Sequence, residues 1–354
     1  MMGNPRRFAA LNTKIRALRG SLLKDSDFIN LMSKDSIEGV ALYLKNDTNY
    51  REVLEGTNVE GIRRGELEPL LKKYIVVQFE KLIHYFTDDY NRLFKTIFAR
   101  FEIEDLKVYL RAISRGEDIT KIVDFIDYPS KYGILDYEVL SSSRNIEEFV
   151  ENLKGTKYYD VLKPYLNEEN RKLLFYMEMN LDRLYFRMLK EDAGRLEDDD
   201  KKLFEEILGK NIDLLNIEWI YRGIKYYNLL SEELINYTLL GGREFKYKDV
   251  KELCYLRDVE KFKEAILSSK YAFLFDTKGD VDLFMERRIE RYMYFEFLKY
   301  LKMGKMDITV SAAYIHLLEY EVRDLISTIE AVRYKLSFDE ASKYLIRRVE
   351  GRDV

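Results

Sequence analysis

Apolar residues recur along most of this chain at the i, i+3, i+4 and i+7 positions that make one face of an α-helix. Near the start, the spacing from Leu11 through Ile15 and Leu18 to Leu22 is four, three and four residues. No convincing run alternates apolar and polar residues as a half-buried strand would, and the 354 residues include only 4 prolines. The pattern therefore predicts an almost wholly helical protein.

The helical pattern returns three times, and in each copy three short blocks follow in the same order. The third block, for example, recurs at Glu102, Asp213 and Glu321, at spacings of 111 and 108 residues. A repeat of this length is the size of a small domain, whereas repeats that stack into a solenoid are shorter. The chain is therefore expected to contain three helical domains, with boundaries at 1–117, 118–228 and 229–354.

The first block begins with a small polar residue that is followed by an apolar residue and a glutamate. A side-chain oxygen at the first position can accept a hydrogen bond from a free amide of a helix start, and a nearby glutamate suits the positive end of the helix dipole. The block therefore predicts a capped helix of about three turns, which closes on a tyrosine. The three capping positions are Ser36, Asn145 and Asp258, and the three closing tyrosines are Tyr50, Tyr158 and Tyr271.

The second block pairs an acid with a base inside an aromatic-rich stretch. The acids are Glu80, Asp182 and Glu290. One helical turn later stand His84, Phe186 and Tyr294. Because the other two copies have an aromatic ring at this position, His84 is predicted to be a packed ring rather than a catalytic or metal-binding group.

The third block places an acid three residues before an Asp or Asn, so both side chains share one helix face. This polar edge is expected to fix how the helix docks rather than to perform chemistry. Six residues past its second position stand Arg111 and Arg222, but the third copy has Glu330. The three pairs are Glu102 and Asp105, Asp213 and Asn216, and Glu321 and Asp324.

Composition narrows the function further. The 59 basic and 63 acidic residues are spread evenly, with a net charge of −4, which argues against a nucleic-acid groove because that would need a concentrated basic stripe. The single Cys254 excludes an intrachain disulfide and is expected to be a buried structural thiol. No apolar run reaches the roughly 20 residues that span a bilayer, and the start lacks the apolar core of a signal peptide. The protein is expected in the cytosol or on a cytosolic membrane surface.

Three local features suggest other chemistry. The acidic run at 197–200 resembles magnesium-binding aspartates, but lysines follow it directly, so it is interpreted as a solvated loop and helix start. Gly241 and Gly242 lack the Lys-Ser or Lys-Thr of a phosphate loop and are interpreted as a linker. The basic N-terminal helix could lie on a membrane, although burial of its apolar stripe in the first domain is favoured. No catalytic residue, cofactor site or metal site is predicted.

The chain resembles the C subunit of bacterial and archaeal V/A-type ATPases, the counterpart of the eukaryotic d subunit. The residues that carry the resemblance are those at 10–19, with Asn12 and spaced arginines, the segment from Glu321 to Asp324, and residues 329–334. The resemblance covers essentially the whole chain. Asp105 and Asp324 stand where this family more often has Asn.

The resemblance implies three similar helical domains arranged with pseudo-threefold symmetry into a funnel. It implies a noncatalytic rotor adapter, peripheral on the inner face of the membrane, that seats on the ring of proteolipid subunits and receives the end of the central shaft in its socket. Torque from ion flow would pass between the ring and the shaft, while the ATP-binding and ion-binding residues belong to other subunits. It implies no cofactor, no nucleic-acid partner and no small-molecule substrate.

Two other functions fit parts of the pattern. A helical-repeat scaffold that binds an unrelated protein would normally have repeats of roughly 30 to 50 residues stacked in a line. An all-helical enzyme acting on a diphosphate would need a second acidic cluster facing the run at 197–200, and none is evident.

Overall fold

The computed structural model describes residues 5–121, 132–166, 173–275, 280–303 and 307–349. These residues form helices and loops, with no β-strand among them. The predicted all-α fold class is confirmed. The chain divides into two compact units. The first consists of Met1–Arg64 and Glu197–Val354, and the second consists of residues 65–196. The three-domain boundaries and the funnel stay predictions.

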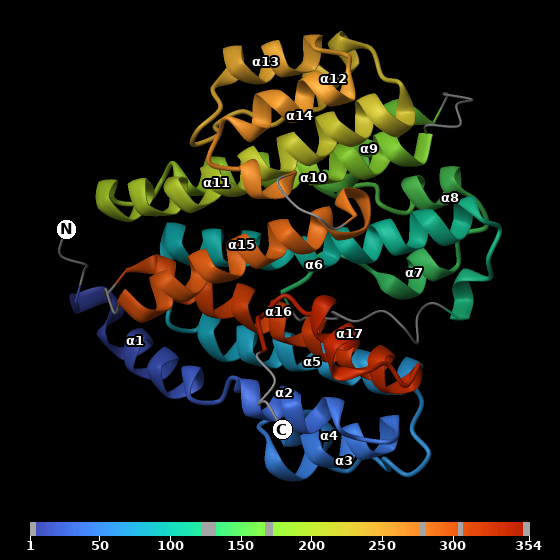
Figure 1. Cartoon of the computed structure of the whole chain (residues 1–354), viewed down its shortest axis with the longest axis vertical. Helices are drawn as coiled ribbons and strands as arrows, with labels where there is room; N and C mark the ends of the chain where they lie inside the picture. The colour runs from blue at the N-terminus through green and yellow to red at the C-terminus, as the bar shows by residue number, and fades with distance from the viewer. Residues whose placement is uncertain (1–4, 122–131, 167–172, 276–279, 304–306, 350–354) are drawn as a thin grey trace. The chain divides into compact units, whose positions relative to one another are not determined.

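The first unit combines the two ends of the chain with everything after residue 196. Its helices are α1 (Pro5–Arg19), α2 (Asp25–Met32), α3 (Ile37–Asp47), α4 (Arg51–Leu54), α11 (Asp198–Arg222), the π-helix η4 (Gly223–Tyr227), α12 (Ser231–Tyr237), α13 (Tyr247–Tyr255), α14 (Val259–Leu267), the 3-10 helix η5 (Ala272–Leu274), α15 (Val281–Met303), α16 (Ile308–Arg333) and α17 (Phe338–Lys343). In Figure 1, α15 lies beside α16, and the two helices pack along their length.

Helix α16 is the centre of this unit, because most of its residues are buried. Besides α15 it contacts α1, α2 and α3, which lie nearly 300 residues earlier in the chain. On α1, Phe8, Leu11 and Ile15 are buried. The predicted stripe is therefore buried in part, since Leu18 and Leu22 are half-buried, and the helix that carries it packs on α16 of the third copy.

The second unit is built from the continuous stretch between the two parts of the first. Its helices are α5 (Arg64–Ile83), α6 (Asp88–Ser114), the 3-10 helix η1 (Ile119–Lys121), α7 (Tyr137–Ser141), α8 (Ile146–Glu151), α9 (Lys157–Leu162), the 3-10 helix η3 (Lys163–Tyr165) and α10 (Leu173–Ala193). Helix α6 packs against α10, and α10 also contacts α9. The ring of Phe79 on α5 stacks on Phe94 and Phe98 of α6, with centroid distances of 4.9 and 4.1 Å. Aromatic stacking thus joins the two long helices of the first copy.

The three first-block helices begin where the sequence pattern places them, but they differ in length. The side-chain oxygens of Ser36, Asn145 and Asp258 accept hydrogen bonds from the amides of Gly39, Glu148 and Lys261 at 3.1, 2.8 and 2.9 Å. The helices that follow have 11, 6 and 9 residues. The middle helix is therefore shorter than the three turns expected.

The prediction that His84 is a packed ring is wrong. Its side chain is exposed, whereas Phe186 is buried and Tyr294 is half-buried. The reason is helix length. Helix α5 ends at Ile83, so His84 lies in the turn that follows, while α10 and α15 continue well past the corresponding residues.

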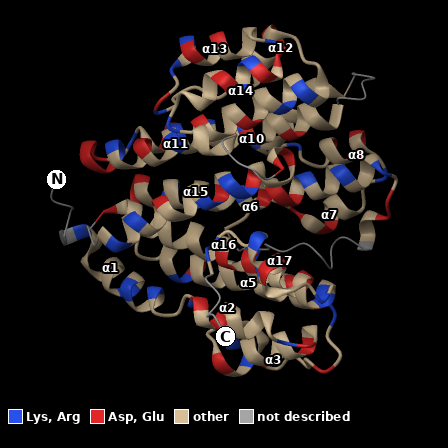
Figure 2. Cartoon of the chain, in the orientation of Figure 1, with Lys and Arg blue, Asp and Glu red and all other residues tan. Residues whose placement is uncertain are grey.

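None of the helices in the described part of the chain is long and apolar enough to cross a membrane. Figure 2 shows Lys and Arg interspersed with Asp and Glu along the same helices. This mixed pattern agrees with the even charge distribution in the sequence.

Candidate functional site

The third-block acids are buried in the middle of three long helices. Glu102 on α6, Asp213 on α11 and Glu321 on α16 are 4%, 0% and 1% exposed. A buried carboxylate is costly unless hydrogen-bond donors surround it. Each acid accepts a hydrogen bond from one of the tyrosines that close the first block: Tyr158 to Glu102 at 2.6 Å, Tyr271 to Asp213 at 2.9 Å, and Tyr50 to Glu321 at 3.0 Å.

These hydrogen bonds join different copies. The tyrosine of copy two docks on the acid of copy one, 56 residues away, and the tyrosine of copy three docks on the acid of copy two, 58 residues away. The tyrosine of copy one docks on the acid of copy three, 271 residues away. We call these contacts the 1–2, 2–3 and 3–1 junctions. The 1–2 junction lies in the second unit, and the other two lie in the first.

Each junction also supplies a backbone amide to the same carboxylate. The N–H groups of Ile134, Glu244 and Leu23 donate to Glu102, Asp213 and Glu321 at 2.6, 2.7 and 2.6 Å. A carboxylate accepts several hydrogen bonds at once, and those to a charged acceptor are stronger than neutral ones. The acid therefore fastens both the tyrosine and the backbone of the segment that docks on the helix.

The second position of the third block holds the neighbouring stretch of chain. Asp105 accepts a hydrogen bond from the hydroxyl of Tyr137 at 2.7 Å. Asn216 both accepts from the amide of Leu239 and donates to its carbonyl, at 2.8 and 2.9 Å. Asp324 accepts from the amides of Ile346 and Arg347 at 2.5 and 3.2 Å. Five of the six third-block positions thus bind a residue of the next copy, whereas Asp324 binds the last described segment of its own copy.

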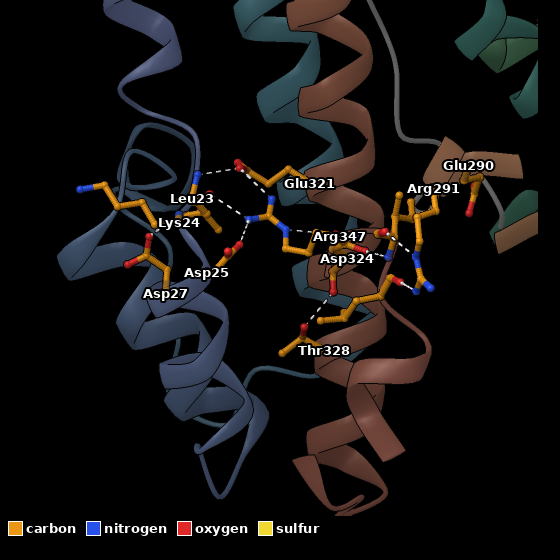
Figure 3. Close-up of polar contacts among 12 residues, drawn as sticks. Leu23, Lys24, Asp25, Asp27, Glu290, Arg291, Glu321, Asp324, Thr328 and Arg347 are labelled. Carbon is orange, nitrogen blue, oxygen red and sulfur yellow. Dashed lines mark hydrogen bonds and ion pairs between the residues drawn. The ribbon is translucent and has the colours of Figure 1, made fainter. Parts of the chain in front are cut away.

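At the 3–1 junction, which Figure 3 shows in close-up, the guanidinium of Arg347 lies beside both third-block carboxylates. Burial raises the pKa of Glu321 to about 7, although the guanidinium of Arg347 and the donors from Leu23 and Tyr50 oppose the shift. Burial also raises the pKa of Asp324, again against the effect of Arg347. At the 2–3 junction, burial raises the pKa of Asp213, and backbone amides and a tyrosine hydroxyl oppose this. Each carboxylate is therefore held by donors aimed at it.

The second-block acids lie on neighbouring long helices, and Asp182 and Glu290 form ion pairs. Asp182 on α10 pairs with Lys107 of α6 at 2.5 Å, and burial raises the pKa of Asp182. Glu290 on α15 pairs with Arg323 of α16, and with Arg287 at 3.1 Å. Glu80 is half-buried on α5. At the 3–1 junction, Arg291, the base that follows Glu290, donates to the carbonyl oxygens of Leu345 and Ile346, and the amide of Ile346 donates to Asp324, so the second and third blocks meet there through the backbone.

The arginines that stand six residues after the second position of the third block also form ion pairs. Arg111 binds Glu178 of α10 through two hydrogen bonds, at 2.7 and 2.8 Å. Arg222 pairs with Glu218 one turn earlier at 3.1 Å. Where the third copy has Glu330 instead, the carboxylate pairs with Arg64 at 2.6 Å.

Among the junction residues that were not recognised from the sequence are Arg347 of the 3–1 junction and Gly242 of the 2–3 junction. A Cβ atom on Gly242 would lie 2.1 Å from Oδ1 of Asp213 and 2.5 Å from the carbonyl oxygen of Phe245. The preceding Gly241 has φ +108°, a conformation that favours glycine. The pair that was interpreted as a linker therefore lets the backbone pass directly over the Asp213 carboxylate. The sequence sign that could have indicated this role is that the other two copies contain no pair of consecutive glycines.

The remaining candidates are structural. Cys254 is fully buried, as predicted. His316, the second of the two histidines in the sequence, is half-buried and stacks on Phe297 at 4.6 Å. The acidic run at 197–200 begins α11, but Asp200 is 5% exposed, so the interpretation of the whole run as solvated is wrong at that residue. The described residues contain no group of three His, Cys, Asp or Glu side chains able to hold a metal ion.

The chain matches a protein family over residues 11–344, and that family is described as ATP synthase (C/AC39) subunit. The C subunits of three archaeal A-type ATP synthases are among its relatives. The one from Methanococcoides burtonii is 25% identical over 81% of this chain and 78% of its own length. Those from Thermococcus kodakarensis and Methanosarcina acetivorans are 22% and 21% identical, over 91% and 90% of this chain and 85% and 87% of their own lengths. The chain therefore belongs to the ATP synthase (C/AC39) subunit family, and it is a subunit of a rotary ATPase.

Proposed function

We propose that this chain is the noncatalytic adapter that joins the membrane ring of proteolipid subunits to the central shaft. The observation that carries the proposal is the cyclic order of the three junctions. Copy two docks on copy one, copy three on copy two, and copy one on copy three. An open scaffold of stacked repeats would leave its first and last repeats without such a contact.

A closed order suits a part that transmits torque. Each junction combines a tyrosine ring with hydrogen bonds to a buried carboxylate, and closely packed interiors of this kind resist deformation. With three junctions in a cycle, a load on one copy would pass to both neighbours. This supports the arrangement into a pseudo-threefold funnel, with the three copies as its domains.

The proposal assigns no chemistry to the chain itself. The buried carboxylates already accept hydrogen bonds from tyrosines and backbone amides, so they are poorly placed to bind a substrate. Hydrolysis or synthesis of ATP and the movement of ions would belong to other subunits. The chain would then lie on the inner face of the membrane as a peripheral part of the complex.

Polar side chains at equivalent positions of the copies would make the shaft contacts. Arg111 and Arg222 hold the same place in their copies, and their side chains are 45% and 51% exposed. Mixed charge with partial exposure is typical of separable protein interfaces.

The test is purification of the tagged chain from detergent-solubilised membranes of its own organism. We expect both a proteolipid ring and a shaft subunit to copurify. Recovery of neither would refute the adapter and favour the scaffold. A second arm compares the double charge reversal Arg111→Glu with Arg222→Glu against the control Lys248→Glu, a side chain 87% exposed on α13. We expect loss of the shaft with the double variant alone, and unchanged shaft binding would refute the assignment of these contacts.

A further inference from the structure

The 3–1 junction differs from the 2–3 junction in how its two docked segments are connected. At the 2–3 junction, Asn216 binds Leu239 and Asp213 binds Glu244. These two partners belong to one short loop, so the backbone itself links them. At the 3–1 junction, Asp324 binds Ile346 and Glu321 binds Leu23. These partners come from opposite ends of the sequence, so no short stretch of backbone links them.

The side chain of Arg347 spans this gap (Figure 3). Its backbone amide and its Nε both donate to Asp324 at 3.2 Å. Its Nη1 donates to the carbonyl oxygen of Leu23 at 2.9 Å, although the two residues are 324 positions apart. The guanidinium carbon also lies 3.9 Å from the ring centroid of Phe28 on α2. One side chain therefore touches both the last segment and the first.

The groups around Arg347 stabilise a buried cation. Arg347 is only 4% exposed, and its Nη2 lies 3.6 Å from Glu321 while Asp25 lies 3.8 Å from Nη1. The backbone that carries it is held in turn by Arg291 of α15, which donates to the carbonyl oxygens of Ile346 and Leu345 at 3.0 and 2.5 Å. A buried arginine is tolerated only with such hydrogen-bonded partners.

The number of third-block carboxylates also differs between the 2–3 and 3–1 junctions. The 2–3 junction has one carboxylate and one amide, Asp213 and Asn216. The 3–1 junction has two carboxylates, Glu321 and Asp324, and the second of these bonds to the guanidinium. At the 3–1 junction the guanidinium offsets the cost of burying the second carboxylate. The 1–2 junction also buries two carboxylates, Glu102 and Asp105, and there the Tyr137 hydroxyl donates to Asp105.

We propose that Arg347 is a positioning residue that replaces the missing backbone link and so closes the cyclic order of the three copies. Its planar fork can bind Asp324 and the Leu23 carbonyl at once, which the single ammonium group of a lysine cannot do in the same geometry. The proposal rests on the cyclic order within the proposed function. It does not depend on the ring or the shaft, so it is tested on the full-length chain alone.

The experiment is hydrogen exchange, read peptide by peptide, on the wild type and four variants. Arg347→Gln removes the link, and Arg347→Lys keeps the charge but loses the fork. Asp324→Asn with Arg347→Gln gives the 3–1 junction the acid and amide of the 2–3 junction without an unpaired second carboxylate. Arg348→Gln changes the exposed neighbour and is the control.

We expect exchange in α1–α4 to rise by about tenfold or more in Arg347→Gln and in the double variant, and to rise by less in Arg347→Lys. Helices α13 and α14, which lie in the sequence between the 2–3 junction residues Glu244 and Tyr271 and belong to the same unit, should exchange as in the wild type, and so should the control variant throughout. Equal acceleration in α1–α4 and α13–α14 would overturn the proposal, because it would mean general loss of stability. Wild-type exchange in Arg347→Lys or in the double variant would also overturn it, because charge alone would then account for the contact.

Discussion

Replacing Tyr158 by phenylalanine tests the 1–2 junction with the loss of one oxygen atom. The phenol donates to Glu102 at 2.6 Å, and the acid is 4% exposed. Once the hydroxyl is removed, Ile134 is the remaining hydrogen-bond donor to Glu102 in the described part of the chain. The aromatic ring stays, so packing around it is preserved.

The expected cost follows from the charge and burial of the acceptor. A hydrogen bond to a charged group contributes about 1.5–3 kcal/mol, and a buried acceptor left short of a donor bears that full loss. At about 2 kcal/mol, the population in which α9 is detached from α6 should rise by roughly thirtyfold. Because the chain has two units, a single free energy of unfolding would average over them, so the measurement must be local.

Hydrogen exchange of the α9 amides under native conditions gives that local measurement. Tyr247→Phe is the matched control, because this tyrosine is 56% exposed and makes no hydrogen bond described in the structure. An increase of less than about threefold in α9, or an equal increase in the control, would refute the view that the buried acid fastens the junction.

Three further outcomes follow from the buried groups. Burial raises the pKa of Glu218 to about 7, so the protonated form favours folding and the free energy of unfolding should fall as pH rises from about 4.5 to 7, by up to ~3 kcal/mol. In urea titrations from pH 5 to 8, followed by the fluorescence of Trp219, the chain's single tryptophan and a residue of the same unit as Glu218, Glu218→Gln should therefore gain stability relative to the wild type as pH rises. A constant difference would contradict this. Gly242→Ala should lower stability by about 3 kcal/mol because of the overlap with Asp213, whereas Gly39→Ala, which meets only ordinary contacts, should change it by less than ~1 kcal/mol in the same titrations. Burial raises the pKa of the Cys254 thiol to about 12, so a colorimetric thiol reagent at pH 8 should react only after denaturation, and rapid reaction with the native protein would contradict the burial.

The helical fold and the equivalence of the third-block positions could be predicted from the sequence, because side-chain periodicity reports which residues share a helix face. The pattern could not show which copy each acid binds. Comparison of the copies shows that Glu102 and Asp213 occupy equivalent positions, but it gives no information on the distance between Glu102 and Tyr158. The exchange of partners between copies is decided by tertiary packing, which a repeat pattern does not contain.

The predictions for His84 and Asp200 were wrong for similar physical reasons. The analogy of His84 with Phe186 fails because α5 ends one residue before the histidine while α10 continues. The charged neighbours of Asp200 suggest a solvated side chain, but the first turn of α11 carries it inward. Helix ends and helix rotation decide these cases, and both depend on packing that a short motif does not encode.

The division of the chain into units also sets the order in which the protein can be completed during synthesis. Residues 65–196 form one continuous unit, so they can fold as soon as they leave the ribosome. The first 64 residues must wait, because Leu23 meets its partner Arg347 only 324 residues later. At ~5–20 residues per second this delay is about 15 to 65 s, during which Phe8, Leu11 and Ile15 have no α16 to cover them. The nascent N-terminal segment therefore carries uncovered apolar side chains until α16 has been synthesised.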